Sequence, residues 1–170
     1  MRPDLLVSWV LVSLVGMPPK KSAGLLPFRL NSKKVEFLLA HPGGPFWKNK
    51  DLGAWSIVKG EYNPDEEPLT AAKREWAEET GLKLSGKFIP LQPVKQKSGK
   101  EILAWAIETD IDPAQIKSNT FEMEWPPKSG RKQSFPEIDR AEWFSIKEAK
   151  KKINPAQVTL IEELIQLLAK

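Results

Sequence analysis

The sequence predicts an α/β (α+β) fold in which one mixed β-sheet is covered by helices. Strand-like segments precede a single helix, further strands follow it, and two helices close the chain, without a repeating strand–helix–strand unit. This order favours a mixed sheet with helices packed on it. With 170 residues, 41 % of them hydrophobic, the chain has the size and apolar content of a single domain with a substantial core.

Three strands and a loop are expected before the first helix. Apolar runs predict strands at residues 22–29, 35–40 and 54–58, and the polar segment 31–34 separates the first two. Residues 41–47 contain two prolines and two glycines, which predicts a loop.

The first helix is predicted at residues 68–80. Pro68 suits its first turn, because the missing N–H of proline would be unpaired there. Leu69, Ala72 and Trp76 recur at helical spacing and form a face to bury. Gly81 follows as a residue that adopts a left-handed cap without strain.

The second half of the chain continues the sheet and adds two helices. Strands are predicted at residues 88–97, 100–109, 119–124 and 141–144, and Ser98-Gly99 forms a hairpin turn between the first two. Prolines and glycine predict a loop at 125–135. The remaining segments, 146–153 and 155–169, are predicted helices, of which the second is amphipathic.

The first 16 residues differ from the rest. Residues 5–15 form an apolar run that is too short to span a membrane, so no stable membrane span is expected. No small-residue cleavage site follows, and Met17 begins a segment typical of a cytosolic start. We therefore interpret residues 1–16 as an over-extended start or a weak targeting segment, and residues 17–170 as the domain.

Composition excludes several kinds of site. The chain has no cysteine, which rules out disulfides, a thiolate nucleophile and a zinc–thiolate centre and agrees with a reducing, cytoplasmic location. Its one histidine, His41, cannot form a histidine-rich metal site, which leaves carboxylate chemistry. The formal charge of +4 favours polyanionic substrates without requiring nucleic acid.

Three glutamates gather on one face of the predicted helix. Glu75, Glu78 and Glu79 are spaced i, i+3 and i+4 in its last turns, where the helix dipole favours cations. One interpretation is a solvated acidic face that pairs with Lys73 and Arg74. The other is a site for a divalent cation with oxygen ligands, such as Mg²⁺ or Mn²⁺.

Residues 60–82 combine these glutamates with other residues at fixed offsets: Gly60, Glu66, Arg74, Glu75, Glu78, Glu79 and Gly81, with Trp76 and Leu82 in apolar positions. This segment resembles the complete signature of the Nudix hydrolases, which favours the interpretation as a metal site. The resemblance implies an enzyme that uses divalent metal ions to cleave a nucleoside diphosphate linked to another group. It also implies an α/β/α sandwich in which the signature forms a loop–helix–loop.

The resemblance also implies roles for these residues. Glu75, Glu78 and Glu79 are expected to coordinate the metal, with Glu66 acting through water or on a second ion. Glu78 and Glu79 are therefore also catalytic candidates, and Arg74 is expected to orient the glutamates through its fork. A general base outside the signature is often needed, and Glu137 is the candidate, with Glu122, Glu124 and Glu142 as rivals.

Substrate contacts are expected from the loops and from the strand before the signature. Phe46 and Trp47 are candidates for stacking on a base, and Lys128 and Arg131 for holding phosphates. The alternative is that the aromatic residues brace their loops and the cations are solvated. Lys59 is included among these candidates for a different reason. The resemblance implies that its backbone carbonyl occupies the place where the family often supplies another oxygen ligand.

The segment that leads into the signature is somewhat similar to that of dinucleoside polyphosphate hydrolases. A dinucleoside polyphosphate or a nucleoside triphosphate-like compound is therefore the first candidate substrate, and no obligate protein partner is implied. The alternative function is a Nudix-fold module that binds nucleotide or RNA without turnover. RNA binding through the basic 128–132 segment is compatible with either function.

Overall fold

The computed structural model describes residues 20–170. The extension at residues 1–16 and the proposed start at Met17 lie outside the described residues, so their interpretation stays a prediction. Within the described part, no helix is both long enough and apolar enough to cross a membrane.

Seven strands form one mixed sheet with the order β4-β6-β1-β2-β9, while β3 pairs with β1 and β5 pairs with β6. The strands are β1 (Lys21–Asn31), β2 (Lys34–Pro42), β3 (Val58–Tyr62), β4 (Phe88–Pro90), β5 (Val94–Lys95), β6 (Glu101–Glu108) and β9 (Ile138–Ser145). The β1–β6 pair is parallel and the other pairs are antiparallel. Two further strands, β7 (Thr120–Glu124) and β8 (Lys132–Pro136), form a separate antiparallel hairpin.

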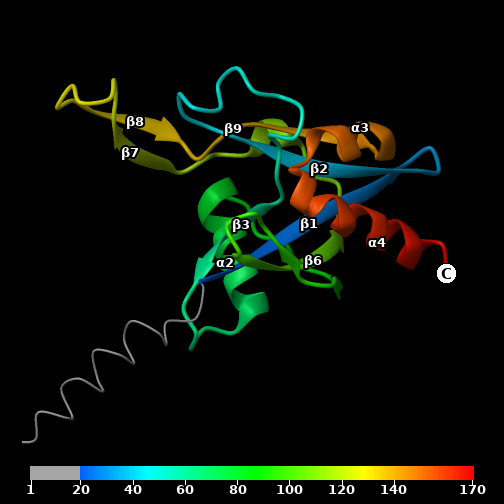
Figure 1. The fold of residues 1–170 in the computed structure, drawn as a ribbon. Helices are drawn as coiled ribbons and strands as arrows, with labels where there is room; N and C mark the ends of the chain where they lie inside the picture. The colour runs from blue at the N-terminus through cyan, green and yellow to red at the C-terminus, as the bar shows by residue number, and fades with distance from the viewer. Residues whose placement is uncertain (1–19) are drawn as a thin grey trace, which may run out of the picture.

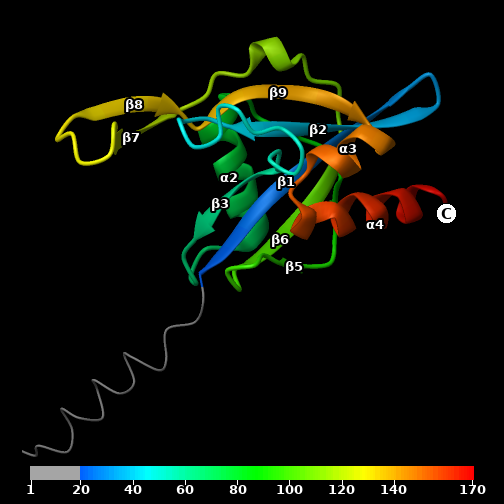
Figure 2. The same ribbon diagram turned by 45° about the horizontal axis from the view of Figure 1, so that its top comes forward.

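Helices cover both faces of the sheet (Figures 1 and 2). Helix α2 (Pro68–Thr80) packs on one face through Ala71, Ala72 and Trp76. Helices α3 (Ile146–Lys152) and α4 (Val158–Leu168) pack on the other, with short 3₁₀ turns at 113–115 and 155–157 in the connections. Alternate residues of the central strands belong to the two cores, as the two-residue period of a strand requires. The predicted α/β/α arrangement is confirmed.

Helix α2 has the predicted bounds and well-formed ends. The side chain of Glu67 caps it by accepting hydrogen bonds from the backbone N–H groups of Leu69 and Thr70. Gly81 ends it in the left-handed conformation at φ 72° and donates to the carbonyl of Ala77. The helix is therefore fixed at both ends, which holds its glutamates in a constant orientation to the sheet.

Several predicted strands and loops have different bounds. Residues 54–57 contribute isolated bridges only, and regular pairing begins at Val58. The predicted strand 88–97 is split into β4 and β5, because Pro90 and Pro93 interrupt its ladder. The predicted loop 125–135 is wrong in its second half, since Lys132 to Phe135 belong to β8. The last strand begins at Ile138, before the predicted start at 141.

Candidate active site

Arg74 joins three of the four predicted metal ligands. Its Nε and Nη2 atoms donate to the two carboxylate oxygens of Glu66 over 2.7 and 2.9 Å. Its Nη1 atom donates to Glu75 over 2.9 Å and to the exposed Glu78 over 3.2 Å. These bonds, the one to Glu66 first, raise the pKa of Arg74 above its ordinary value, and the same contact lowers the pKa of Glu66. The guanidinium therefore holds together carboxylates that would otherwise repel one another.

Gly60 lies against the carboxylate of Glu75. A Cβ atom at residue 60 would come within 2.1 Å of the Glu75 Cδ atom, which is far inside van der Waals contact. Strand β3 thus requires a glycine at this position for a steric reason, and the requirement is set by the packing of the strand against helix α2.

Glu79 lies one turn after Glu75 on α2 and is half-buried. Burial raises its pKa to about 8, and the charges of Glu75, Glu137 and Glu78 add to the rise. The charge of Lys59 on β3 opposes the rise, while burial, followed by the charge of Lys100, lowers the pKa of Lys59 itself. A half-buried carboxylate therefore feels the charges of three other carboxylates and of one half-buried lysine.

Glu137 comes from a segment that is distant in sequence. It connects β8 to β9, and its backbone accepts a hydrogen bond from Gly43 and donates one to Asn119, over 3.0 and 2.9 Å. Its charge contributes to the raised pKa of Glu79, so the two carboxylates act on each other electrostatically. Among its rivals, Glu124 instead accepts a bond from Gly130 in the hairpin turn.

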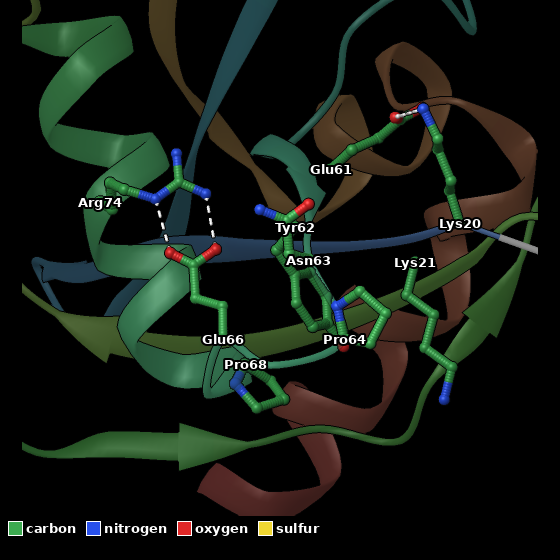
Figure 3. A pocket seen from close by; sticks show the side chains of 9 residues that line it. All are labelled: Lys20, Lys21, Glu61, Tyr62, Asn63, Pro64, Glu66, Pro68 and Arg74. Atoms are coloured by element: carbon green, nitrogen blue, oxygen red, sulfur yellow. Dashed lines mark hydrogen bonds and ion pairs between the residues drawn. The ribbon is translucent and has the colours of Figure 1, made fainter.

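A cavity of about 650 Å³ opens on the Glu66 side of Arg74 (Figure 3). Figure 3 shows the paired bonds from Arg74 to Glu66 at one wall and the ion pair of Lys20 with Glu61 at another. Its lining residues are Lys20, Lys21, Glu61, Tyr62, Asn63, Pro64, Glu66, Pro68 and Arg74. The cavity combines cations with an aromatic wall, and sequence patterns did not point to it because its walls come from β1, β3 and the signature loop together.

The predicted substrate-binding aromatic residues lie on an exposed surface beside the hairpin. Phe46 is 59 % exposed and meets the ring of Trp125 edge to face, with centroids 5.5 Å apart. The amine of Lys50 lies 5.0 Å from the centre of the Trp47 ring, and Trp47 is 37 % exposed. The loop 43–50 and the hairpin thus form one surface, which we call the aromatic face.

The structure does not place all the predicted substrate residues together. Lys128 and Arg131 lie in the turn that ends the β7–β8 hairpin, which projects from the main sheet in both views (Figures 1 and 2). Lys59, by contrast, lies on β3, where its charge interacts with that of Glu79. The hairpin turn is therefore remote from helix α2 and its carboxylates.

The donor set suits a hard divalent cation, although the side chains are not arranged around one. Within residues 20–170, no three histidine or acidic side chains stand close enough to form a complete coordination group. Arg74 occupies oxygens of Glu66, Glu75 and Glu78. The chemical character of the group is the remaining observation. The pKa values of Glu79 and Glu75 are raised, chiefly by burial, so their ionised forms are unfavourable in the absence of a cation. A divalent cation would neutralise this excess of negative charge, so the residues fit one.

Solved structures of other proteins share this fold. Ap4A hydrolase from C. elegans, as a binary complex, superposes with a TM-score of 0.62 at 20 % identity, over 88 % of this chain and 98 % of that chain. The NUDIX domain of Shewanella oneidensis NrtR, complexed with ADP ribose, superposes with a TM-score of 0.62 at 13 % identity, over 99 % of each chain. The E. coli ORF135 protein gives a TM-score of 0.52 at 24 % identity, over 89 % of this chain and 93 % of that chain. At these identities the similarity shows a common fold.

The sequence itself matches a family. Comparison with curated proteins gave no significant match. The family model described as the NUDIX domain matches residues 18–164, which is most of the chain and includes α2 with its glutamates. The resemblance seen in the signature is thereby confirmed, and the chain belongs to the NUDIX domain family.

Proposed function

We propose that this protein is a metal-dependent hydrolase that cleaves a phosphoanhydride bond in a nucleoside diphosphate linked to another group. A Nudix domain implies a pyrophosphohydrolase in general. The observation that carries the proposal for this chain is the raised pKa of Glu79. Burial and the neighbouring glutamates raise this pKa to about 8. Such a clustering of carboxylates destabilises a metal-free protein and is typical of a functional site.

Glu75, Glu78, Glu79 and Glu66 are the residues that would hold Mg²⁺ or Mn²⁺. Nudix enzymes generally use divalent metals of this kind. When bound, the cation neutralises phosphate oxygens and lowers the pKa of a water molecule. Glu78, which is exposed and bound to Arg74 only over 3.2 Å or more, is the ligand that changes partner most easily.

The chain's own groups supply positioning and proton transfer. Arg74 orients Glu66 and Glu75 through its fork, and Gly60 leaves the space that Glu75 occupies. Glu137 accepts a proton from the attacking water. At the same time the water oxygen bonds to phosphorus, and the bond from phosphorus to the oxygen of the leaving phosphate breaks. The half-buried Lys59, whose charge interacts with that of Glu79, supplies positive charge to the anionic substrate and to the leaving group.

The aromatic face supports a substrate that carries a nucleobase. The exposed rings of Phe46 and Trp47 offer stacking surfaces, and Glu137 follows the hairpin on which Trp125 lies. A dinucleoside polyphosphate or a nucleoside triphosphate-like compound is therefore the proposed substrate, with its base on the aromatic face. The solved relatives named above include an Ap4A hydrolase and a NUDIX domain complexed with ADP ribose. A small-molecule partner and a cytoplasmic location are part of the proposal.

The test is a set of nucleotide compounds incubated with purified residues 17–170, with and without Mg²⁺ or Mn²⁺. Products are separated by chromatography, and Glu79→Gln is the control. We expect metal-dependent cleavage of a base-bearing diphosphate compound that the variant does not cleave. Binding of nucleotide or RNA without cleavage of any compound would overturn the proposal in favour of a binding module.

A further inference from the structure

His41, the only histidine of the chain, is fully buried and uses both of its ring nitrogens. Its Nδ1 atom lies 2.7 Å from a carboxylate oxygen of Asp139, and its Nε2 atom lies 2.7 Å from the backbone carbonyl oxygen of Lys50. The ring also meets Trp55 edge to face, with centroids 5.1 Å apart. The proposed hydrolysis makes no use of this residue.

The two partners determine how many protons the ring carries. A carbonyl oxygen and an ionised carboxylate are both acceptors only, whereas a neutral imidazole has a single N–H group. Both short contacts are hydrogen bonds only if a proton lies between the atoms in each. The carboxyl group of aspartic acid is ordinarily a much stronger acid than an imidazolium, and Arg140 adds a positive charge 3.8 Å from Asp139, so the shared proton belongs to the ring.

We infer that His41 is a buried imidazolium that positions the loop 43–50 and the start of β9 relative to each other. Strand β2 carries the ring, the carbonyl of Lys50 fixes the loop on one side, and the carboxylate of Asp139 fixes β9 on the other. His41 is therefore a positioning residue for the candidate site. This role in catalysis rests on the proposed function, while its charge state does not.

A β-bulge makes the contact with Asp139 possible. Along the β2–β9 pair, His41 is opposite Arg140 and Pro42 is opposite Ile138, which leaves Asp139 as an extra residue. Its carboxylate therefore meets His41, while its neighbour Arg140 lies over the ring of Trp55 at 5.2 Å. In a regular strand, adjacent side chains would point to opposite faces.

The groups that His41 holds belong to the proposed substrate site. Lys50, whose carbonyl accepts from His41, also donates its backbone N–H to the Trp47 carbonyl over 3.0 Å, and its side-chain amine lies over the Trp47 ring. On the other side, Asp139 is two residues from Glu137, the candidate base. One charged ring thus links an aromatic substrate residue with the segment that carries the base.

The charge state can be measured without any knowledge of substrate. In protein labelled with ¹⁵N-histidine, the single residue gives one pair of ring-nitrogen signals, and both are expected in the protonated range at neutral pH. Asp139→Asn, whose amide can donate to Nδ1, is expected to leave one nitrogen unprotonated. The matched control Asp51→Asn removes the carboxylate of the residue after Lys50, which accepts from Trp55 instead, and it should leave both nitrogens protonated. An unprotonated nitrogen in the wild-type protein would overturn the inference, whether or not the variants fold.

Kinetics test the positioning role. We expect Asp139→Asn to raise the KM of a base-bearing substrate by about tenfold while kcat changes by less than about threefold, because the aromatic loop moves while the helix carboxylates stay and Glu137 keeps its backbone bond to Asn119. A compound with a phosphoanhydride but no base should show no such rise in KM. Unchanged KM for both compounds would refute the positioning role. If no compound is cleaved, the proposed function fails, and the nitrogen signals still decide the charge of His41.

Discussion

Replacing Glu79 by glutamine should stabilise the metal-free protein while it abolishes activity. Burial and three glutamates raise the pKa of Glu79 from 4.5 to about 8 in the folded chain. The folded protein therefore holds the proton more tightly than the unfolded chain does. For that reason, the contribution of this group to stability falls as the pH rises from 4.5 towards 8.

The size of the effect follows from the shift. Each unit of pKa is worth about 1.4 kcal/mol, so the full shift corresponds to roughly 5 kcal/mol of lost stability above the folded-state pKa. Glutamine removes the charge but keeps a polar amide in the same half-buried place. We therefore expect the free energy of unfolding of Glu79→Gln to exceed that of the wild type by about 2–4 kcal/mol at about pH 9, and by less than about 1 kcal/mol at about pH 5.

The assay is urea denaturation of both proteins in the presence of a chelator at several pH values. Glu78→Gln is the matched control, because its side chain is 51 % exposed on the same helix turn and its removal should change stability little at any pH. Added Mg²⁺ should stabilise the wild type and not Glu79→Gln. A difference between wild type and Glu79→Gln that stays constant from about pH 5 to about pH 9 would refute the reasoning, since the linkage requires it to grow.

Three further substitutions test other parts of the site. Gly60→Ala places a Cβ atom 2.1 Å from the Glu75 Cδ atom and should lower kcat by about a hundredfold, which steady-state kinetics would measure. Arg74→Lys loses the fork that binds Glu66 and should weaken Mg²⁺ binding by about tenfold in calorimetry; unchanged affinity would exclude an orienting role. Glu137→Gln should lower kcat by about 10²- to 10⁴-fold with metal affinity preserved, and full activity would assign the base to another glutamate.

The sequence alone determined the local structure of the signature. The bounds of helix α2 follow from Pro68 at its start and Gly81 at its end, and both act within a few residues of themselves. The helical spacing of Glu75, Glu78 and Glu79 places them on one face regardless of the rest of the chain. The order of strands and helices was also enough to predict a mixed sheet between helical layers.

Contacts between distant segments were decided only by the tertiary structure. The β7–β8 hairpin was predicted as a strand and a loop, because the polar residues of β8 lack an apolar alternation and find their partners across the turn. The steric need for Gly60 depends on how close β3 packs to α2. The raised pKa of Glu79 depends on burial and on Glu137, which lies far along the chain.

The pairing of His41 with Asp139 shows the same division most clearly. The two residues are 98 positions apart, and their contact requires both the register of β2 with β9 and a one-residue bulge in that register. Nothing in the sequence near either residue specifies that bulge, since strand register is set by burial over the whole sheet. The sequence therefore determined which chemical groups the site contains. The packing of distant segments decided which of them are charged, buried and in contact, because these properties depend on neighbours that local patterns do not identify.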